Sequence, residues 1–523
     1  MKCYEGAILS VDENNNVFRY LVEDQGRIIY VGNTLPERYI NAKRINLGKR
    51  ALIPSFVDSH QHFASFSTFQ AGLNVMDAES NTEISEMIRE FVSRSKSNTL
   101  ICFGTSPYSV KEGRLISREE LGAVCPDKEI MVVKHDGHAC IVNTKLLNKM
   151  KDKVKNLRGY HPDTGEMNQE AFFRFSDYIS SSLSLTELFS NMMNAADFMA
   201  QHGIGMVHTV SGVGFAMNLD ITFEKIFAKS LKNGFQLRVF PQPMNIKVAK
   251  SRKLPRIGGC FESALDGCFG SHDAAMLEPY VDSEGGDGVL YYSDEKVTEF
   301  CKAANRAGLQ IEMHAIGDKA FDQATRALKA ALDDYPRKDH RHGIIHDCLP
   351  TEEGIRICKE YEILMPVQSA FINWKQEPDA YLESILGAER CNRLNPIRTF
   401  RDNGIIVSFG SDAPCTSPDP IIWMDKAVNN ENASEAVTIQ DALRMCTYNG
   451  YYTTFDETER GSLEVGKIAD MVILSENPYA IPSKALSGLK VEKLILAGKD
   501  YRSARRSVTR AIVDGLTNGS KAY

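Results

Sequence analysis

The stretch PSFVDSHQH, residues 54–62, runs from an apolar segment directly into two histidines, and it decides the fold. Ala51–Val57 has the composition of a buried β-strand, and the histidines follow at its end. Side chains two positions apart in an extended chain point the same way, so His60 and His62 can hold one metal ion from one side. Such a pair also occurs by chance on surfaces and in cores, so a metal site needs support from the rest of the chain.

Farther along, helical patterns alternate with short apolar runs, which is typical of βα units and a mostly parallel sheet. Two predicted strands, Leu309–His314 and Gly343–His346, end in a histidine, and Ile405–Phe409 is followed by Asp412. Barrel enzymes keep their catalytic groups at the carboxyl ends of parallel strands, so we expect these side chains to meet the first pair. Repetition at roughly 30–40 residues per unit favours a closed (β/α)8 TIM barrel over an open sheet.

The two ends of the chain differ from this middle part. Short apolar or alternating runs, separated by turn residues, lie at Ala7–Val11, Val17–Val22, Arg27–Val31, Ala469–Leu474 and Val491–Ala497. This is the pattern of antiparallel hairpins. Neither end has enough strands to close a core alone, so we expect one small β-sandwich built from both ends.

These patterns predict two domains in the 523 residues. A small β-sandwich domain with a C-terminal tail comprises residues 1–50 plus 459–523, and the (β/α)8 barrel comprises residues 51–458. The less regular segment at about 63–129 is expected to be an insertion after the first barrel strand. The tail Tyr501–Tyr523 carries several arginines and is predicted to be a solvated helix that can join a subunit contact, so we expect a homodimer.

Composition excludes several classes of function. The chain is 43% apolar and 25% charged, with no apolar stretch near the roughly 18 residues that a membrane span needs. A net charge of −7 without a basic block gives no electrostatic basis for binding nucleic acid. Met1–Val11 lacks the apolar region and the cleavage site of a secretory signal. We therefore expect a cytoplasmic protein that acts on a small molecule.

The cysteines are predicted to be structural. Twelve are scattered from Cys3 to Cys446 without a CxxC pair, and many lie in apolar runs. A free thiol in such a run behaves as a small hydrophobic group. The spacing argues against a cysteine-ligated metal, so we expect reduced cysteines in the core.

Several segments together resemble a known family. They are PSFVDSHQH, DGHACIVN from Asp136 to Asn143, DGCFGSHDAAMLEPY from Asp266 to Tyr280, IEMHAIGDKAFD, RHGIIHD, VSFGSDAP and GSLEVGKIADMVIL from Gly461 to Leu474. In this order they resemble the amidohydrolase superfamily, and most of all its amidohydrolase family 3 branch. The resemblance implies a barrel flanked by a small β-sandwich, and it implies hydrolysis, usually of a C–N bond.

The resemblance also implies a metal centre. Its ligands fall on His60, His62, His314, His346 and Asp412. Members of this branch usually have a carboxylated lysine, four residues before the DG of Asp266 and Gly267, that bridges two metal ions. Here that position is Glu262, whose carboxylate can serve the same purpose without modification. The alternative is that Glu262 is a solvated charge and the site holds one metal.

The expected cofactor is Zn²⁺, two per chain, because mixed nitrogen and oxygen ligands suit zinc, with Mn²⁺ or Fe²⁺ as alternatives. The resemblance implies amide, formamide or cyclic-amide hydrolysis by metal-activated hydroxide, with Asp412 taking the proton and passing it to the leaving amine. A lactone or ester hydrolase would use the same ligands. A metal-binding regulatory protein without turnover is the third alternative, and retention of Asp412 argues against it.

Other residues are candidates for contact with substrate. Asp136 and His138 follow the predicted strand Ile130–Val133, and His138 is the best candidate for a carbonyl or carboxylate contact. The alternative is that both residues fix a loop by hydrogen bonds. His208 follows the predicted strand Gly205–Val207 and is expected to line the pocket. Phe371 and Trp374 either form an apolar wall or pack against outer helices.

Overall fold

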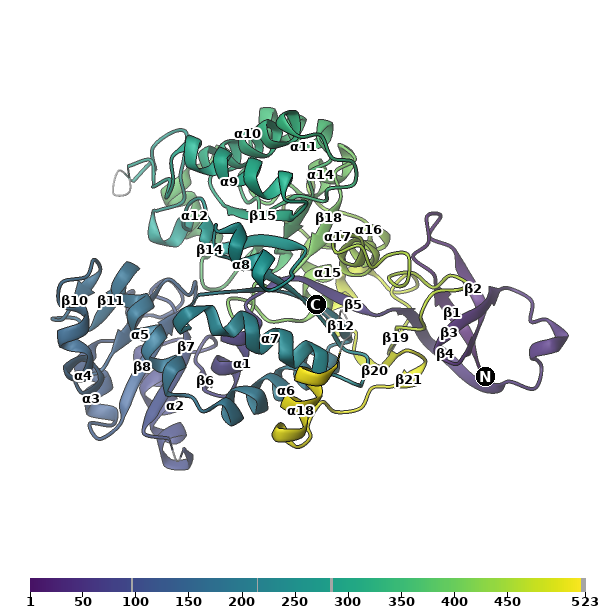
Figure 1. The fold of residues 1–523 in the computed structure, drawn as a ribbon, viewed down its shortest axis with the longest axis horizontal. Helices are drawn as coiled ribbons and strands as arrows, with labels where there is room; N and C mark the ends of the chain where they lie inside the picture. Colours follow the sequence, from purple (N-terminus) through teal and green to yellow (C-terminus); the bar gives the residue numbers. More distant parts are fainter. Residues whose placement is uncertain (96, 214, 283–285, 519–523) are drawn as a thin grey trace.

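The computed structural model describes residues 1–95, 97–213, 215–282 and 286–518 as a mixed α/β fold. Figure 1 shows a sheet that contains the N-terminus at one end of the long axis, a separate α/β lobe at the other end, and the remaining strands and helices between them. The middle part carries the predicted metal ligands His60, His62, His314, His346 and Asp412 at or near the ends of its strands.

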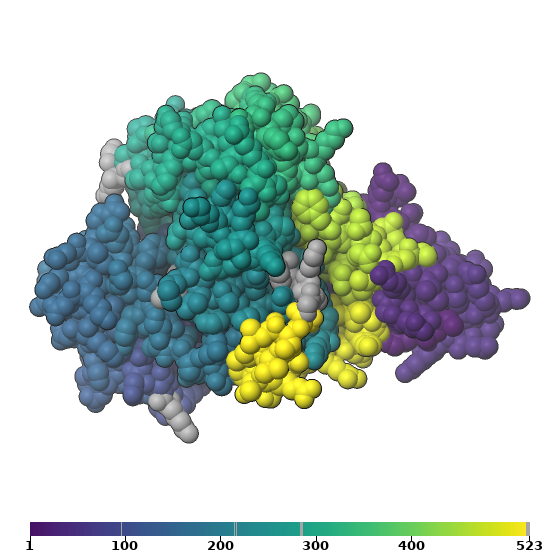
Figure 2. All heavy atoms as spheres, in the orientation of Figure 1, coloured from purple at the N-terminus to yellow at the C-terminus, as the bar shows by residue number. Residues whose placement is uncertain are grey.

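Strands from both ends of the chain form one sheet of seven strands in the order β21-β20-β19-β4-β1-β2-β3. Their bounds are β1 Lys2–Leu9, β2 Val17–Asp24, β3 Arg27–Gly32, β4 Lys43–Pro54, β19 Met471–Leu474, β20 Val491–Leu496 and β21 Lys499–Asp500. β19 lies antiparallel to β4, with Met471 opposite Pro54. Figure 2 shows C-terminal residues packed directly against the N-terminal ones. The pairing gives one continuous sheet instead of the two sheets of a sandwich.

Ser55 alone separates β4 from β5, so the terminal sheet leads straight into the middle part. Three parallel ladders lie there: β5-β12-β13, β14-β15-β16 and β17-β18. Their bounds are β5 Phe56–Gln61, β12 Ile204–Ser211, β13 Gln236–Pro241, β14 Arg256–Ala264, β15 Gln310–Ala315, β16 Gly343–His346, β17 Met365–Val367 and β18 Val407–Phe409. Nearly every residue of these strands is buried, as expected for a sheet covered by helices. The ladders are not joined into one closed sheet by their strand pairing.

Helices follow most of these strands and cover them. Their bounds are α6 Leu185–Gln201, α7 Leu219–Ser230, α8 Ile246–Ser251, α9 Asp294–Arg306, α10 Asp318–Asp334, α11 Glu352–Glu360, α12 Asp379–Leu386, α13 Ala388–Cys391, α14 Ile397–Asp402, α15 Pro420–Val428, α16 Ile439–Cys446 and α17 Tyr448–Thr453. α9 begins after Ser293, whose side chain accepts a hydrogen bond from the Lys296 backbone N–H and so caps the helix. Its apolar face, with Val297, Phe300 and Ala304, enters the main core.

The segment between β5 and β12 folds around a sheet of its own, in the order β10-β11-β9-β8-β7-β6. Its elements are α1 Phe63–Gln70, β6 Leu73–Asn74, α2 Asn81–Arg94, β7 Thr99–Thr105, α3 Arg118–Val124, β8 Glu129–Lys134, β9 Ala139–Val142, α4 Thr144–Val154, β10 Tyr160–His161, β11 Glu166–Asn168 and α5 Gln169–Ser182. This sheet continues to Asn168, so the inserted segment is longer than the predicted 63–129. β8, the strand before Asp136, therefore belongs to the insertion.

The tail ends in α18, Val508–Thr517, which packs on α7. A side chain at Gly515 would collide with the Ile226 backbone, so glycine permits this close packing. The Arg506 guanidinium binds Asp514 and the Ser230 carbonyl, which ties the start of the tail helix to the same place. Residues 519–523 of the predicted tail lie outside the described residues. No helix in the described part of the chain is long and apolar enough to cross a membrane.

Candidate metal centre and substrate pocket

Asp412 meets the two histidines at the end of β5. Its Oδ1 atom lies 3.2 Å from Nε2 of His60 and 3.2 Å from Nε2 of His62. The two strand ends are held in register because the Asp412 backbone N–H donates to the His60 carbonyl at 2.8 Å. Both His60 ring nitrogens and Asp412 Oδ1 are buried without making a hydrogen bond. Buried polar atoms are almost always partnered, so these atoms fit the donor set of a metal ion.

The other two predicted imidazoles lie beside this group. The ring centroid of His346 is 5.4 Å from that of His60 and 4.5 Å from that of His314. Potential ligand atoms of His60, His346 and Asp412 all lie within 4.8 Å of one another, and so do those of Cys260, His314 and His346. The structure thus brings together five of the six predicted ligands, all except Glu262. It adds Cys260, which the sequence did not predict as a ligand.

Glu262 is not among them. Its side chain is exposed and lines an adjoining surface cavity with Tyr292, whose hydroxyl donates to the Glu262 backbone carbonyl. The prediction that Glu262 bridges two metals therefore disagrees with the geometry. The physical reason is a bulge in β14: Gly259 pairs with Met313 and Ala264 with His314, so the intervening residues have no partners on β15.

Three residues at the cluster have left-handed backbone conformations, which are unfavourable for residues other than glycine. The φ angles are 43° for Phe261, 76° for His346 and 53° for Asp412. Conformations of this kind persist where the surrounding structure enforces them, and they concentrate at functional sites. Here the unusual backbone turns ligand side chains inward at strand ends.

A second set of residues orients the ligands. The Gln368 amide oxygen lies 2.6 Å from Nδ1 of His346, which leaves Nε2 of that ring for the cluster. Asp266 accepts the backbone N–H groups of Ile316 and Gly317 and lies 3.4 Å from His314 Nε2. Asp266 belongs to the DG segment that resembles the family, but neither it nor Gln368 is among the ligands predicted from the sequence.

The ligands differ in charge state before metal binds. Burial lowers the pKa of His62, but its hydrogen bond to Asp412 outweighs burial and raises that pKa to about 9, and the pKa of His314 is also raised, so metal has to displace a proton from each of these imidazoles. Burial raises the pKa of Asp412, but the neighbouring imidazoles of His60 and His62 outweigh burial and hold it well below its usual value. Burial lowers the pKa of His60, so this imidazole is neutral at physiological pH. An ionised carboxylate and a neutral imidazole are the forms that coordinate metal.

The cluster opens into a pocket with mostly apolar walls. The largest of its lining side chains are aromatic: Phe69, Phe103, Phe172, Phe173, Phe215, Phe261, Phe269, Phe371 and Trp374. His62, His314, His346 and Asp412 lie at its polar end. Phe371 and Trp374 pack against each other with tilted rings, whose centroids are 4.9 Å apart, and both line the pocket, as one of the two interpretations of the sequence predicts.

Asp136 and His138 both reach this pocket, although they come from the insertion. The Asp136 carboxylate is engaged by Lys134 at 2.9 Å and accepts the His138 backbone N–H. The His138 ring is half-buried and lies 5.5 Å from that of Phe261. The His138 Nδ1 atom in turn lies 2.8 Å from the Asp136 carbonyl oxygen, so both residues make hydrogen bonds that order the loop, and both line the pocket. Contact of His138 with a substrate stays a prediction.

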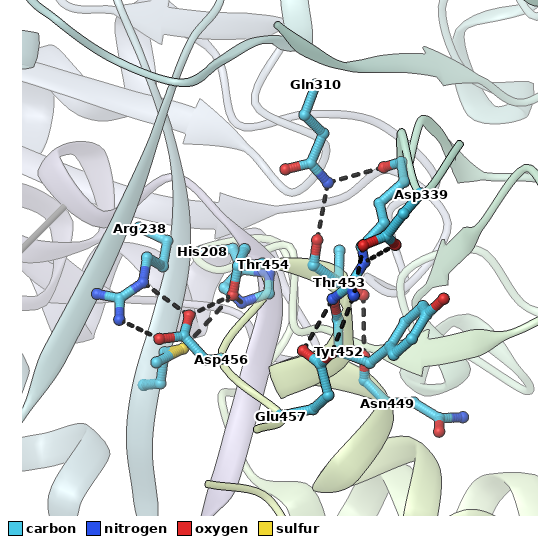
Figure 3. A network of polar contacts seen from close by, with 12 residues as sticks. His208, Arg238, Gln310, Asp339, Asn449, Tyr452, Thr453, Thr454, Asp456 and Glu457 are labelled. Carbon is cyan, nitrogen blue, oxygen red and sulfur yellow. Dashed lines mark hydrogen bonds and ion pairs between the residues drawn. The ribbon is translucent and has the colours of Figure 1, made fainter. Parts of the chain in front are cut away.

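His208 lies elsewhere, and its predicted place in the pocket is wrong. Figure 3 shows it in a polar network with Thr454, Asp456 and Arg238. Its Nε2 atom is 3.2 Å from the Thr454 hydroxyl, which also donates to Asp456, and Asp456 pairs with Arg238. The prediction ended the strand at Val207, but β12 continues to Ser211, so His208 lies within the strand and away from its carboxyl end.

Comparison with known proteins shows the family and agrees with the fold. The model of the amidohydrolase family matches residues 43–500, and the chain belongs to this family of hydrolases. The putative amidohydrolase YtcJ of Bacillus subtilis is 23% identical over 89% of this chain and 92% of its own length. An N-substituted formamide deformylase of Arthrobacter pascens is 22% identical over 94% and 96%. An uncharacterized metal-dependent hydrolase from Pyrococcus horikoshii has the same fold, with a TM-score of 0.75, 21% identity and coverage of 92% and 99%.

Proposed function

We propose that this protein is a metal-dependent hydrolase that cleaves the C–N bond of an uncharged, largely apolar amide, formamide or cyclic amide. The observation that carries the proposal is the position of Asp412, in contact with His60 and His62 at the polar end of an aromatic pocket. A purely structural cluster would have no reason to face a pocket of this kind. The formamide deformylase among the relatives supports the reaction class.

We further propose that the three parallel ladders belong to one (β/α)8 barrel. β5 and β12 to β18 are eight strands met in chain order. The Ile344 N–H donates to the Leu364 carbonyl between β16 and β17, and the Asp412 N–H donates to the His60 carbonyl between β18 and β5. β13 and β14 are also in contact. In a barrel, the cluster would occupy the face formed by the carboxyl ends of the strands, where barrel enzymes bind substrate.

The centre is proposed to hold two divalent ions, with zinc as the best match to imidazole and carboxylate ligands and Mn²⁺ or Fe²⁺ as alternatives. His60, His62 and Asp412 would hold one ion, and His314 and His346 the other. Bound metal lowers the pKa of water and polarises a carbonyl. Asp412 accepts the proton of the attacking water and returns it to the leaving nitrogen, which lets the amine depart neutral. His138 faces the substrate from the insertion side.

The pocket also restricts the substrate. No lysine or arginine lines it among the residues that the structure describes, and the nearby Lys134 is already paired with Asp136. A substrate carboxylate would lose its hydration there without gaining a cationic partner, which is costly. An aryl or alkyl group would instead bury apolar area against Phe173, Phe261 and Trp374.

The test uses two compounds that differ by one carboxylate. With zinc-loaded protein, N-formylphenethylamine should be hydrolysed with a kcat/KM at least tenfold above that for N-formylphenylalanine, because only the second must desolvate a charge. Chelation should abolish turnover, and added zinc should restore it. Preference for the carboxylated compound would contradict the substrate class. Turnover of the matching phenethyl ester without turnover of any amide would indicate an ester or lactone hydrolase, and no turnover at all would favour a regulatory protein.

A further inference from the structure

Cys260 is the one cysteine placed inside the histidine cluster among the described residues. It is 3% exposed, and its Sγ atom lies 3.3 Å from Nδ1 of His314. The potential ligand atoms of Cys260, His314 and His346 all lie within 4.8 Å of one another. The thiol therefore touches the half of the centre that His314 and His346 form.

The same thiol also interacts with the other half. The imidazoles of His346 and His62 are both hydrogen-bond partners of the Cys260 sulfur. His62 belongs to the pair that meets Asp412 at 3.2 Å. Cys260 thus lies between the two groups of ligands, at the place where a ligand shared by two metal ions has to be.

The local backbone explains why the cysteine turns inward. Gly258 and Gly259 have φ angles of 102° and 130°, and a Cβ atom at Gly259 would lie 2.3 Å from a Val210 methyl group. The glycines let β14 pass this close to its neighbours before the bulge begins. Within the bulge Cys260 is buried, Phe261 lines the pocket and Glu262 is exposed.

We propose that the Cys260 thiolate is the bridging ligand of the metal centre, in the position that sequence counting gave to Glu262. This rests on the proposed function, because it presumes that the centre holds two metal ions. The S–H bond breaks when metal binds, its proton passes to solvent, and the sulfur shares its electron pairs with the two ions. Thiolate is a strong ligand for zinc, and a single one needs no CxxC spacing when the fold supplies the other ligands.

The first test uses the unaltered protein. X-ray absorption of protein loaded with two zinc ions should show about one sulfur per zinc at about 2.3 Å, because a bridging sulfur is counted by both ions. About half a sulfur per zinc would mean that Cys260 binds one ion only, and would overturn the bridge. Two zinc ions without sulfur would overturn the proposal while leaving the metal centre intact. Failure to bind any zinc would overturn both.

The second test uses variants and a signal that does not depend on turnover. Cobalt-loaded protein should show the near-ultraviolet charge-transfer band of a cobalt thiolate, and Cys260→Ser should abolish that band. Cys415→Ser is the matched control, since Cys415 lines the same pocket but belongs to none of the ligand groups found in the described residues. It should keep the band, and so should Glu262→Gln. A band that survives Cys260→Ser, or that disappears with Glu262→Gln, would overturn the proposal.

Discussion

The Asp58 carboxylate accepts two hydrogen bonds from Ser411, at 2.9 Å from the backbone N–H and 2.6 Å from the hydroxyl. Asp58 lies on β5, two residues before the first metal-ligand candidate, and Ser411 directly precedes Asp412. The pair is fully buried, so water does not compete for these bonds. It fixes the distance between the histidines of β5 and the carboxylate that follows β18.

Removing this link should weaken metal binding without removing a ligand. We expect Asp58→Ala to lower zinc affinity about 10–100-fold, the usual effect of losing a partner that orients ligands. Ser411→Ala keeps the backbone hydrogen bond and should cost less. Competition with a coloured chelator measures both affinities. Unchanged affinity in Asp58→Ala would show that the β5 histidines and Asp412 hold their places without the pair.

Asp412→Asn separates the role of this residue as a ligand from its role as a proton carrier. The amide oxygen can still bind metal but cannot take a proton, so kcat should fall about 10²–10⁴-fold while much of the metal is retained. The loss should be smaller for an anilide with an activated leaving group than for an alkyl amide. Metal analysis beside the kinetics provides the control. Near wild-type kcat on an alkyl amide with full metal content would exclude Asp412 from proton transfer.

His208 should make stability depend on pH. Burial, assisted by the charge of Arg256, lowers its pKa to about 3 in the folded protein, against 6.5 for the free side chain. Between these values the unfolded chain binds more protons than the folded one, so this contribution to stability is lost as pH falls below about 6.5. Replacing His208 by Gln should reduce the stability difference between pH 7.5 and pH 5 by about 2 kcal/mol.

Urea unfolding at the two pH values measures this difference, because other groups contribute equally to both proteins. His161→Gln changes an exposed histidine and should leave the wild-type difference intact. If His208→Gln also keeps the wild-type difference in stability between the two pH values, the pKa of the buried His208 imidazole is not lowered in the folded protein.

The terminal sheet should need both ends of the chain. Deleting Met1–Gly48 removes β1 to β3 and most of the apolar cluster that they share with Leu52, Met471 and Ile473. It also removes the first half of β4 and leaves the rest of that strand with an open edge where β1 was paired, which favours aggregation. We expect insoluble protein, measured as the soluble fraction and by size-exclusion chromatography. A soluble, fully active truncation would show that β19 to β21 are stable without these strands.

Much of the site could be predicted because its ligands end strands. The apolar runs before His60, His314 and His346 are local sequence patterns, which can be recognised in a single sequence without knowledge of the tertiary structure. Glu262 was assigned by counting back from Asp266, which assumes an unbroken strand, whereas the bulge in β14 turns Cys260 inward instead. A bulge depends on how neighbouring strands pack, and one sequence carries little record of that.

The sheet that unites the two ends of the chain also sets the order in which the protein can be completed. β4 leaves the ribosome early, but β19, which covers one of its edges, is made only after the whole middle of the chain. At about 5–20 residues per second, that edge waits on the order of half a minute to a minute for its partner. Until then, neighbouring nascent chains offer it the same backbone hydrogen bonds, so biosynthesis is the period in which this protein most needs a chaperone.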